Sequence, residues 1–494
     1  MNRIGTVVTV GVGFGALVSA AYLAYGGPLN PPAGAVSPSY KTLTEVEPRT
    51  MLSAANTPGD ANSVFKITQA GSYYLGGVLF ATPGKSGIEV AAADVTIDLN
   101  GFTISGEPGS LDGVDLSSGA AARVTVKNGK IFACGRDGIN GENSGPAHLH
   151  DLQILNCPRR GIGINSGTII ERCTVELCGG AGGAVPNGGI GAGNAVTVID
   201  CQVNQNFGVG ISCGTASIVK GCDAIGNTGP GIVINAGFSG QVMDCTADTN
   251  GGDGISVPLR SNVHNCHARG NGGNGIVTGD ESKIDACTAA LNGDSGIVAA
   301  SSSTVIGCAA NGNGTNAAGT TRDGIACATG CTVTACTASG NGDDGITMSS
   351  FGTISGCTTW NNTDDGIFAP GGGTIIRECS CTGNLGDGIT VNADCLVVGN
   401  ICDNHNTNGA AGIRTLGSDC RVENNNCTDN NQGVRADAPG NIFLANTCSG
   451  NTTNYSMVAG NFALVVNAAS AGIISGSSGG TALGTTDPRA NLSF

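Results

Sequence analysis

Aromatic and charged residues are scarce in this chain of 494 residues. Aromatic residues make up 4% of the sequence and charged residues 12%. Large aromatic side chains normally supply much of a globular core, and long exposed helices need many charged residues. We therefore expect a core of many small apolar side chains and no long helices. The 84 glycines of the chain agree with this expectation.

Basic residues are also few. There are 22 Lys+Arg against 37 Asp+Glu, which gives a formal net charge of -15 at pH 7. A nucleic-acid partner requires a basic surface for its phosphates, so the composition excludes nucleic acid as the expected partner. An acidic surface suits divalent cations, neutral glycans, or anionic glycans bridged by a cation.

Long hydrophobic runs are absent except at the N-terminus. Residues 1–25 contain Arg3 and then an apolar run from Ile4 to about Leu23 that ends among small residues. This pattern is typical of a secretory signal peptide, and an uncleaved N-terminal membrane anchor is the alternative. Residues 26–60 begin with several prolines and predict a linker. We expect an extracellular or cell-surface protein that contacts the membrane only through its N-terminal segment, if that segment is not cleaved.

Cysteine recurs at a nearly constant interval of about 21 to 23 residues, with one longer step. The column consists of Cys201, Cys222, Cys245, Cys266, Cys287, Cys308, Cys336, Cys357, Cys379 and Cys402. An asparagine usually follows five residues later, at Asn206, Asn227, Asn250, Asn271, Asn292, Asn313, Asn341, Asn362 and Asn384. Nine or ten residues after most of these cysteines comes Gly-Ile. Such a fixed period is the signature of a repeat protein.

A repeat of this length, with short β-type runs and glycine corners, cannot close a core alone and must stack on its neighbours. The sequence therefore predicts an all-β fold, a single-stranded parallel β-helix of about 15 coils with 21–23 residues each. We place the β-helix at residues 61–454. Residues 455–494 lose the Cys and Asn columns and predict a C-terminal cap over the last coil.

The two columns are explained by packing. Cysteine is a small, readily buried hydrophobe, and stacked Cβ atoms about 4.8 Å apart are farther apart than the roughly 3.8 Å that a disulfide prefers. Cys327 with Cys331 and Cys379 with Cys381 are better disulfide candidates. Asparagine tolerates the left-handed backbone of a sharp corner and can hydrogen-bond the asparagines above and below it.

The Asn-Gly-Asp-Gly-Ile coil resembles the right-handed parallel β-helix repeats of the pectate-lyase-like superfamily, over about residues 85–455. Residues 47–77, followed by the strand DVTIDLNGF, resemble the first coil of secreted bacterial members. The superfamily includes pectate lyases, polygalacturonases, uronan epimerases and phage tailspikes, so the resemblance implies an extracellular polysaccharide or cell-surface glycan as partner. The fold alone does not select a reaction.

Polygalacturonases offer the most specific comparison. Asp323 in TRDGI resembles the aspartate of their first motif, and Asp343 with Asp344 in NGDDGI resembles their aspartate pair one coil later. The sequence then departs from that pattern, because Asp364-Asp365-Gly366 stands where their histidine turn would be.

Four aspartates are expected at one position of four successive coils, namely Asp323, Asp344, Asp365 and Asp387, with Asp343 and Asp364 beside them. Unit charges about 5 Å apart repel by roughly 1 kcal/mol in water and about 3 kcal/mol at an effective dielectric constant of 20. Solvent, a shared proton or a Ca²⁺ ion can offset this repulsion. Aspartate before glycine is also ordinary turn chemistry. The segment AANGNGTNAAGTTRD lengthens the chain beside this column, as functional insertions in repeat proteins do.

We predict candidate catalytic residues at Asp323, Asp343, Asp344 and Asp365. The candidate Ca²⁺ ligands are Asp343, Asp344, Asp364, Asp365 and Asp387, and Ca²⁺ is the only cofactor expected. A hydrolase would use two carboxylates, such as Asp344 and Asp365, whereas a lyase or epimerase would need a base such as Arg322 or Lys283.

Two histidine pairs, His148 with His150 and His264 with His267, are either metal ligands or exposed side chains; no third metal ligand is evident for either pair.

The sequence thus predicts an exported β-helix protein that binds extracellular, uronan-like polysaccharide on an acidic face. If it is an enzyme, it is a polysaccharide lyase, a glycoside hydrolase or an epimerase. The alternative is a non-catalytic structural or adhesin-like rod at the cell surface.

Overall fold

The computed structural model describes residues 47–180, 188–235, 237–314, 322–467, 473–476 and 489–493. The chain divides into two compact units, Met1–Arg49 and Thr50–Phe494. The predicted signal peptide or anchor and most of the predicted linker lie outside the described residues, so export remains a prediction. Among the described residues, no helix is long and apolar enough to cross a membrane.

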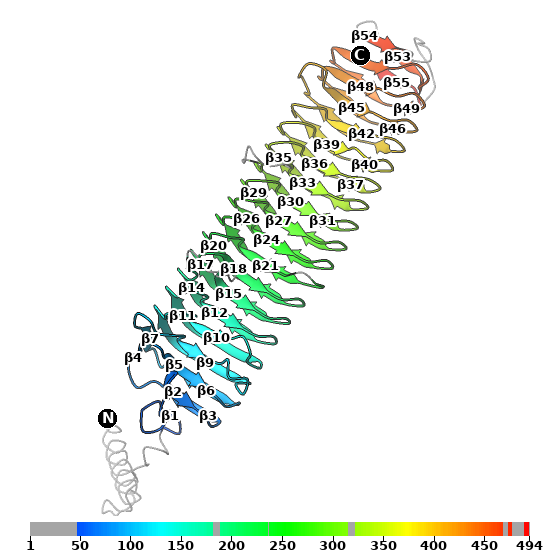
Figure 1. Cartoon of the computed structure of the whole chain (residues 1–494). Coiled ribbons are helices and arrows are strands. Elements are labelled where there is room, and N and C mark those ends of the chain that lie inside the picture. Colours follow the sequence, from blue (N-terminus) through cyan, green and yellow to red (C-terminus); the bar gives the residue numbers. More distant parts are fainter. Residues whose placement is uncertain are drawn as a thin grey trace, which may run out of the picture. The chain divides into compact units, whose positions relative to one another are not determined.

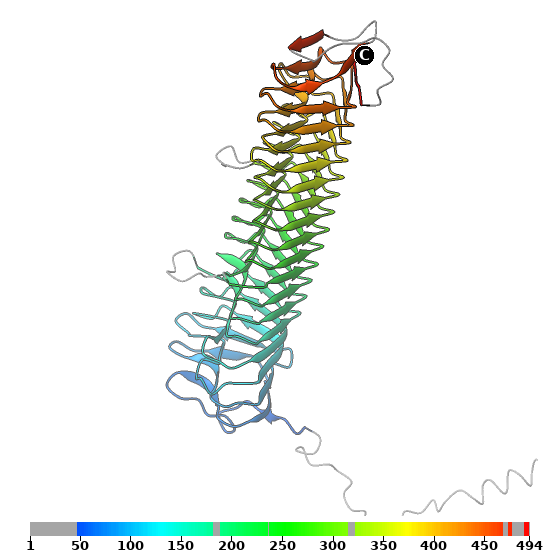
Figure 2. The same cartoon turned by 90° about the vertical axis from the view of Figure 1, so that its right-hand side faces the viewer.

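The second unit is an all-β solenoid of about 18 turns, in which parallel strands stack along one axis (Figures 1 and 2). The predicted fold class is therefore confirmed. The count of about 15 coils was too low, because the first coils, such as the one that contains β2 (Ser63–Ile67), carry none of the cysteines used for counting.

Strands of the first face pair in parallel from one coil to the next. They are β2 (Ser63–Ile67), β5 (Ser86–Val90), β8 (Val114–Asp115), β10 (Ile139–Gly141), β12 (Ile162–Ile164), β15 (Gly188–Ala192), β18 (Val209–Cys213), β21 (Ile232–Ile234), β24 (Ile255–Val257), β27 (Ile276–Thr278), β30 (Ile297–Ala299), β33 (Ile325–Cys327), β36 (Ile346–Met348), β39 (Ile367–Ala369), β42 (Ile389–Val391), β45 (Ala411–Thr415), β48 (Gln432–Ala436), β51 (Thr453–Met457) and β54 (Ile473–Gly476).

The second face consists of β1 (Thr50–Met51), β3 (Gly71–Tyr74), β6 (Val95–Asp98), β9 (Val124–Phe132), β11 (Ala147–Leu155), β13 (Ile169–Glu171), β16 (Thr197–Ile199), β19 (Ile218–Lys220), β22 (Gln241–Met243), β25 (Asn262–His264), β28 (Lys283–Asp285), β31 (Thr304–Ile306), β34 (Thr332–Thr334), β37 (Thr353–Ser355), β40 (Ile375–Arg377), β43 (Leu396–Val398), β46 (Arg421–Glu423), β49 (Ile442–Leu444) and β52 (Phe462–Ala463).

The third face consists of β4 (Leu79–Ala81), β7 (Thr103–Gly106), β14 (Thr174–Glu176), β17 (Gln202–Asn204), β20 (Asp223–Ile225), β23 (Thr246–Asp248), β26 (His267–Arg269), β29 (Thr288–Ala290), β32 (Ala309–Asn311), β35 (Thr337–Ser339), β38 (Thr358–Trp360), β41 (Ser380–Thr382), β44 (Ile401–Asp403), β47 (Asn426–Thr428), β50 (Thr447–Ser449) and β55 (Asn491–Ser493), with β53 (Val465–Asn467) paired to β55. Strands β9 and β11 are long enough to belong to both the second and the third face.

Alternation along each short strand builds the core. In β24, Ile255 and Val257 point inward and Ser256 points outward, whereas in β25 and β26 only the middle residues, Val263 and Ala268, are buried. Successive side chains of a strand point to opposite sides, so three residues suffice for each face. The interior is filled mostly by Ile, Val, Leu, Ala and Cys, as the composition predicts.

All 22 cysteines are buried and none forms a disulfide. The disulfides suggested for Cys327 with Cys331 and for Cys379 with Cys381 are therefore wrong. Cys402 also does not continue the cysteine column, because it pairs with Cys381 on the third face. Asn400 takes the column position above Cys379 and accepts a hydrogen bond from its backbone N–H (2.9 Å).

The asparagine column forms a buried hydrogen-bonded ladder. The backbone N–H and the side-chain Nδ2 of Asn250 both donate to Oδ1 of Asn271, at 3.1 and 2.9 Å. Asn271 in turn donates from Nδ2 to the carbonyl of Ala247 (3.0 Å). The left-handed corner lies one residue earlier than predicted, at Thr249 (φ 53°) and Gly270 (φ 63°). The asparagine therefore satisfies buried backbone groups rather than making the turn itself.

This ladder gives a first prediction. Asn271→Ala removes the acceptor of two Asn250 donors and the donor to Ala247, and buried polar groups left unpaired cost about 1–3 kcal/mol each. We expect the free energy of unfolding, measured by urea denaturation, to fall by at least about 2 kcal/mol. Arg269→Ala, in an exposed position of the same coil, should change it by less than about 0.5 kcal/mol. Equal effects of the two substitutions would contradict the structural role of the ladder.

Candidate functional site

One edge of the first face carries a column formed by the residue that precedes the first-face glycine in each coil, which we call the pre-glycine column. Its members are Ser86, Asp112, Asp137, Arg160, Gly188, Val209, Pro230, Asp253, Asn274, Ser295, Asp323, Asp344, Asp365, Asp387, Ala411 and Gln432. The N–H of Gly324 donates to the carbonyl of Asp344 (2.9 Å), and that of Gly345 to the carbonyl of Asp365 (2.9 Å). The four predicted aspartates therefore do stack in four successive coils.

Three aspartates of this run, Asp344, Asp365 and Asp387, each use one carboxylate oxygen to hold the next coil. Oδ1 of Asp344 accepts the N–H of Asp365 (2.8 Å), and Oδ1 of Asp365 accepts the N–H of Asp387 (2.6 Å). Elsewhere in the column Asn274 accepts the N–H of Ser295 in the same way (3.1 Å). A side-chain acceptor that satisfies a backbone donor explains why Asp, Asn and Ser recur at this position.

Burial and mutual repulsion raise the pKa of these carboxyl groups. Burial is the main cause in each case and raises the pKa of Asp323 to about 6. For Asp344, burial together with the charges of Asp365 and Asp323 raises the pKa to about 8. For Asp365, burial and the charge of Asp387 raise the pKa to about 7. A column of carboxylates in a poorly solvated edge thus retains protons near neutral pH.

A cavity of about 310 Å³ opens beside the C-terminal part of this run of aspartates. It is lined by Asp364, Asp365, Leu385, Gly386, Asp387, Thr407, Asn408, Gly409, Ala410, Arg414 and Arg435. Both arginines are the outward residues of first-face strands, β45 and β48. Acidic groups with raised pKa values and two guanidinium groups therefore face the same space.

Sequence reasoning missed these two arginines. Nη1 of Arg414 lies 3.5 Å from Oδ2 of Asp387, and both Arg414 (2.8 Å) and Arg435 (2.7 Å) pair with Asp437. The available signal was an arginine directly after Gly-Ile and after Gly-Val in two successive coils. That position faces outward on the first face, but its direction can be assigned only when the strand register is known.

The other predicted basic groups are placed differently. Lys283 lies on the second face and pairs with Asp285 (2.9 Å), away from the pre-glycine column. Arg322 directly precedes Asp323. Seven of the 15 residues of the segment AANGNGTNAAGTTRD, residues 315–321, lie outside the described residues, so its functional role stays a prediction.

Three of the five predicted Ca²⁺ ligands lie together. Carboxylate oxygens of Asp343, Asp344 and Asp364 are all within 4.8 Å of one another. Oxygens that share one Ca²⁺ at 2.3–2.6 Å are separated by no more than about 5 Å, so this trio fits the ion. The other two predicted ligands, Asp365 and Asp387, are outside the trio and line the cavity.

The histidine pairs form no comparable group in the described part of the chain. Nε2 of His148 pairs with Glu171 (3.1 Å), and the His148 and His150 rings lie 4.5 Å apart between centroids. Nδ1 of His264 pairs with Asp285 (3.3 Å). Within the described ranges, the acidic trio is the only set of three potential metal ligands with this spacing.

A family model described as right handed beta helix region matches residues 66–218, 214–286 and 346–486. These matches span well over half of the chain. The chain belongs to the right-handed β-helix family. The predicted resemblance to right-handed parallel β-helix proteins is therefore confirmed.

Solved structures of other right-handed β-helix proteins resemble the chain at low identity. The A-module of the Azotobacter vinelandii mannuronan C-5 epimerase AlgE4 is 14% identical, with a TM-score of 0.35, over 75% of this chain and 90% of that one. Tailspike protein 3 of bacteriophage CBA120 is 9% identical, with a TM-score of 0.28, over 94% and 71%. The Agl-KA catalytic domain is 13% identical, with a TM-score of 0.26, over 78% and 62%. At this level of similarity, these structures do not indicate an activity for the chain.

No curated protein matches the sequence significantly.

The raised pKa values predict how stability depends on pH. The folded protein holds protons on Asp323, Asp344 and Asp365 that the unfolded chain, with carboxyl pKa values near 4, has already released. Stability should therefore be greatest near pH 4 to 5 and fall as pH rises, by about 1.4 kcal/mol per pH unit for each such carboxyl. Each contribution to the slope ends at the pKa of that group in the folded protein, about 6 for Asp323, about 7 for Asp365 and about 8 for Asp344. Urea denaturation in the presence of a chelator measures this.

Asp344→Asn is the diagnostic variant. Asparagine keeps the oxygen that accepts the N–H of Asp365, as Asn274 does in its own coil. The variant should be more stable than the native protein at pH 8 and show a flatter pH dependence. Asp253→Asn, in the same column but outside the acidic run, should leave the slope unchanged. A native protein whose stability is flat between pH 5 and 8 would overturn the assignment.

Proposed function

We propose that this protein binds an acidic, uronan-type polysaccharide at the cavity between the acidic run and the two arginines, and modifies it by proton transfer. The observation that carries the proposal is that Asp365, with a pKa of about 7, shares one cavity with Arg414 and Arg435. A titrating carboxyl and cations for the substrate's carboxylate thus line one cavity.

The arginines suit the substrate's charge. A guanidinium group binds a carboxylate through two parallel hydrogen bonds, and neutralising a uronate makes its neighbouring C–H more acidic. Arg414 pairs with Asp387 and Asp437, and Arg435 pairs with Asp437 and donates to the carbonyl of Gly409. Each guanidinium group has five N–H donors, so donors on both remain for a substrate.

Asp365 is the best candidate for the proton-transferring group. A general acid or base works best with a pKa near the working pH, and the pKa of Asp365 is about 7. One of its oxygens is held by the N–H of Asp387, which fixes the orientation of the carboxyl group. Asp344 does not line the cavity. This arrangement favours proton abstraction beside a carboxylate, as in a lyase or epimerase, over hydrolysis by the pair Asp344 and Asp365.

The trio of Asp343, Asp344 and Asp364 supplies a neighbouring position for Ca²⁺, and Asp364 belongs both to the trio and to the cavity lining. A bound Ca²⁺ would add a third cation, besides Arg414 and Arg435, for the polymer's carboxylates. Binding of an extracellular polymer also agrees with the predicted signal peptide and extracellular or cell-surface location.

The second candidate function is a non-catalytic surface rod. The observation in its favour is that the acidic run does structural work, since Asp344, Asp365 and Asp387 each accept a backbone N–H of the next coil.

Turnover assays separate the two functions. The purified protein is incubated with polygalacturonate and with alginate, with Ca²⁺ or chelator, and unsaturated ends, reducing ends and the epimer ratio are measured. We expect the native protein to produce unsaturated ends or to change the epimer ratio. The rate of this reaction should fall at least 100-fold in Asp365→Asn and at least tenfold in Arg435→Ala. Asp253→Asn is the matched control. If neither polymer is bound or changed, the rod function takes precedence.

Calcium binding is tested separately by titration calorimetry. Asp364→Asn removes one charged ligand of the trio and should weaken Ca²⁺ binding at least tenfold. Asp253→Asn should bind Ca²⁺ as the native protein does. Affinity that is unchanged in Asp364→Asn would show that the trio does not hold the ion.

A further inference from the structure

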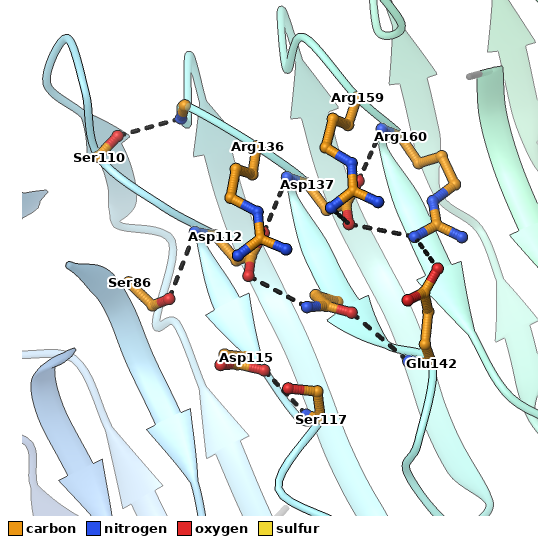
Figure 3. A network of polar contacts seen from close by, with 12 residues as sticks. Ser86, Ser110, Asp112, Asp115, Ser117, Arg136, Asp137, Glu142, Arg159 and Arg160 are labelled. Atoms are coloured by element: carbon orange, nitrogen blue, oxygen red, sulfur yellow. Dashed lines mark hydrogen bonds and ion pairs between the residues drawn. The ribbon is translucent and has the colours of Figure 1, made fainter. Parts of the chain in front are cut away.

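A second polar network lies toward the N-terminal end of the same pre-glycine column. There Arg136, Arg159 and Arg160 gather beside Asp112 and Asp137 (Figure 3). Both aspartates are fully buried, at 1% and 0% exposure. Both of these carboxylates pair with arginine, whereas in the acidic run only Asp387 does so, through Arg414. The column therefore changes its chemistry along the axis.

Arg160 is held rigidly in this network. Its backbone N–H donates to Oδ1 of Asp137 (2.8 Å), and its Nη2 donates to Oδ2 of Asp137 (3.2 Å) and to Oε1 of Glu142 (2.5 Å). The side chain is only 12% exposed. A guanidinium group fixed by two carboxylates is preorganised for a ligand, because little conformational entropy remains to be lost on binding.

Two glycines let the Arg160 side chain lie against the first face. Gly163 and Gly191 occupy the outward positions of strands β12 and β15. A Cβ atom at Gly163 would come within 2.6 Å of Cζ of Arg160, and one at Gly191 would approach its Cδ to 3.2 Å. Glycine at a position where another group approaches the backbone closely is a recognised feature of strands.

These glycines also leave a cavity of about 390 Å³ beside Arg160. It is lined by Glu142, Arg160, Ile164, Ile190, Gly191, Ala192, Gly193, Val209 and Ser212. Its floor is glycine and alanine backbone, its walls include isoleucine and valine, and its polar groups are Arg160, Glu142 and the hydroxyl of Ser212. The lining is thus mixed, with apolar surface beside a few placed polar groups, and such a combination is a feature of small-molecule sites.

The charge of this cavity argues against an anionic ligand, because Asp137 and Glu142 together offset the charge of Arg160. Adjacent donor and acceptor groups suit the neighbouring hydroxyls of a sugar, which donate and accept. We propose that this cavity binds one neutral sugar unit, with its hydroxyls on Arg160, Glu142 and Ser212 and its C–H face on the glycine floor.

This site is separate from the acidic cavity. Ten coil steps along the pre-glycine column separate Arg160 from Asp387, which corresponds to roughly 50 Å at about 4.8 Å per step. The two cavities share no residues. The inference therefore goes beyond the proposed function and does not depend on it.

The test uses ligand-observed NMR and calorimetry with glucose, galactose, mannose and N-acetylglucosamine as probes. The native protein should bind at least one of them. Gly191→Val places a side chain over the cavity floor and should weaken that binding at least tenfold. Valine already occupies the outward position of β21, β27 and β30, so the fold should accept it. The matched control, Ser256→Val in β24, should leave the affinity within twofold.

A second variant guards against a folding defect. Glu142→Gln keeps the shape of the side chain but removes its charge, and should weaken sugar binding several-fold with an unchanged circular dichroism spectrum. Asp365→Asn, in the acidic cavity, should bind the sugar like the native protein, even if all polysaccharide turnover is lost. Failure of all four sugars to bind, or unchanged binding in Gly191→Val, overturns the proposal.

Discussion

The hydrogen bond from each coil to the next is the constraint on which the rest of the structure depends. Parallel stacking at about 4.8 Å places every residue directly over its equivalent in the neighbouring coil. Identical side chains of neighbouring coils therefore lie in contact and must be compatible with one another. Asparagine meets this requirement at Asn250 and Asn271, because its amide both donates and accepts. Cysteine, valine and isoleucine do so by packing, and none of the 22 cysteines forms a disulfide.

Aspartate meets the same constraint with an electrostatic cost. Asp344 and Asp365 accept backbone N–H groups as Asn274 does, yet their charges repel. Burial and this repulsion together raise their pKa values, and the repulsion is relieved by protons at the centre of the acidic run and by Arg414 near its C-terminal end. At the other end of the column, Asp137 is paired with Arg160 instead. The same backbone position thus yields two different sites.

The period of the cysteines, together with the Gly-Ile positions, was enough to predict the parallel stack and the vertical register of Asp323 through Asp387. Features that depend on a local change in the spacing between coils could not be predicted from the sequence. Cys402 follows Cys379 at the expected interval, yet the structure places it over Cys381, because Asn400 takes the column position. The cavity beside Asp365 was hidden for a similar reason: Arg414 is distant in sequence, and only the outward direction of β45 brings it there.

The two oxygens of the aspartate carboxylates in the pre-glycine column have different partners. In Asp112, Asp137, Asp344 and Asp387 one oxygen is bound to the next coil, and the other faces a side chain near the first face. The second oxygen of each of these four carboxylates thus accepts a hydrogen bond from a side chain on or beside the first face. Aspartate recurs in four successive coils only from Asp323 to Asp387, so a linear polymer whose repeat matched the coil spacing would meet a carboxyl group at each of these four coils and at none of the three coils from Gly188 to Pro230.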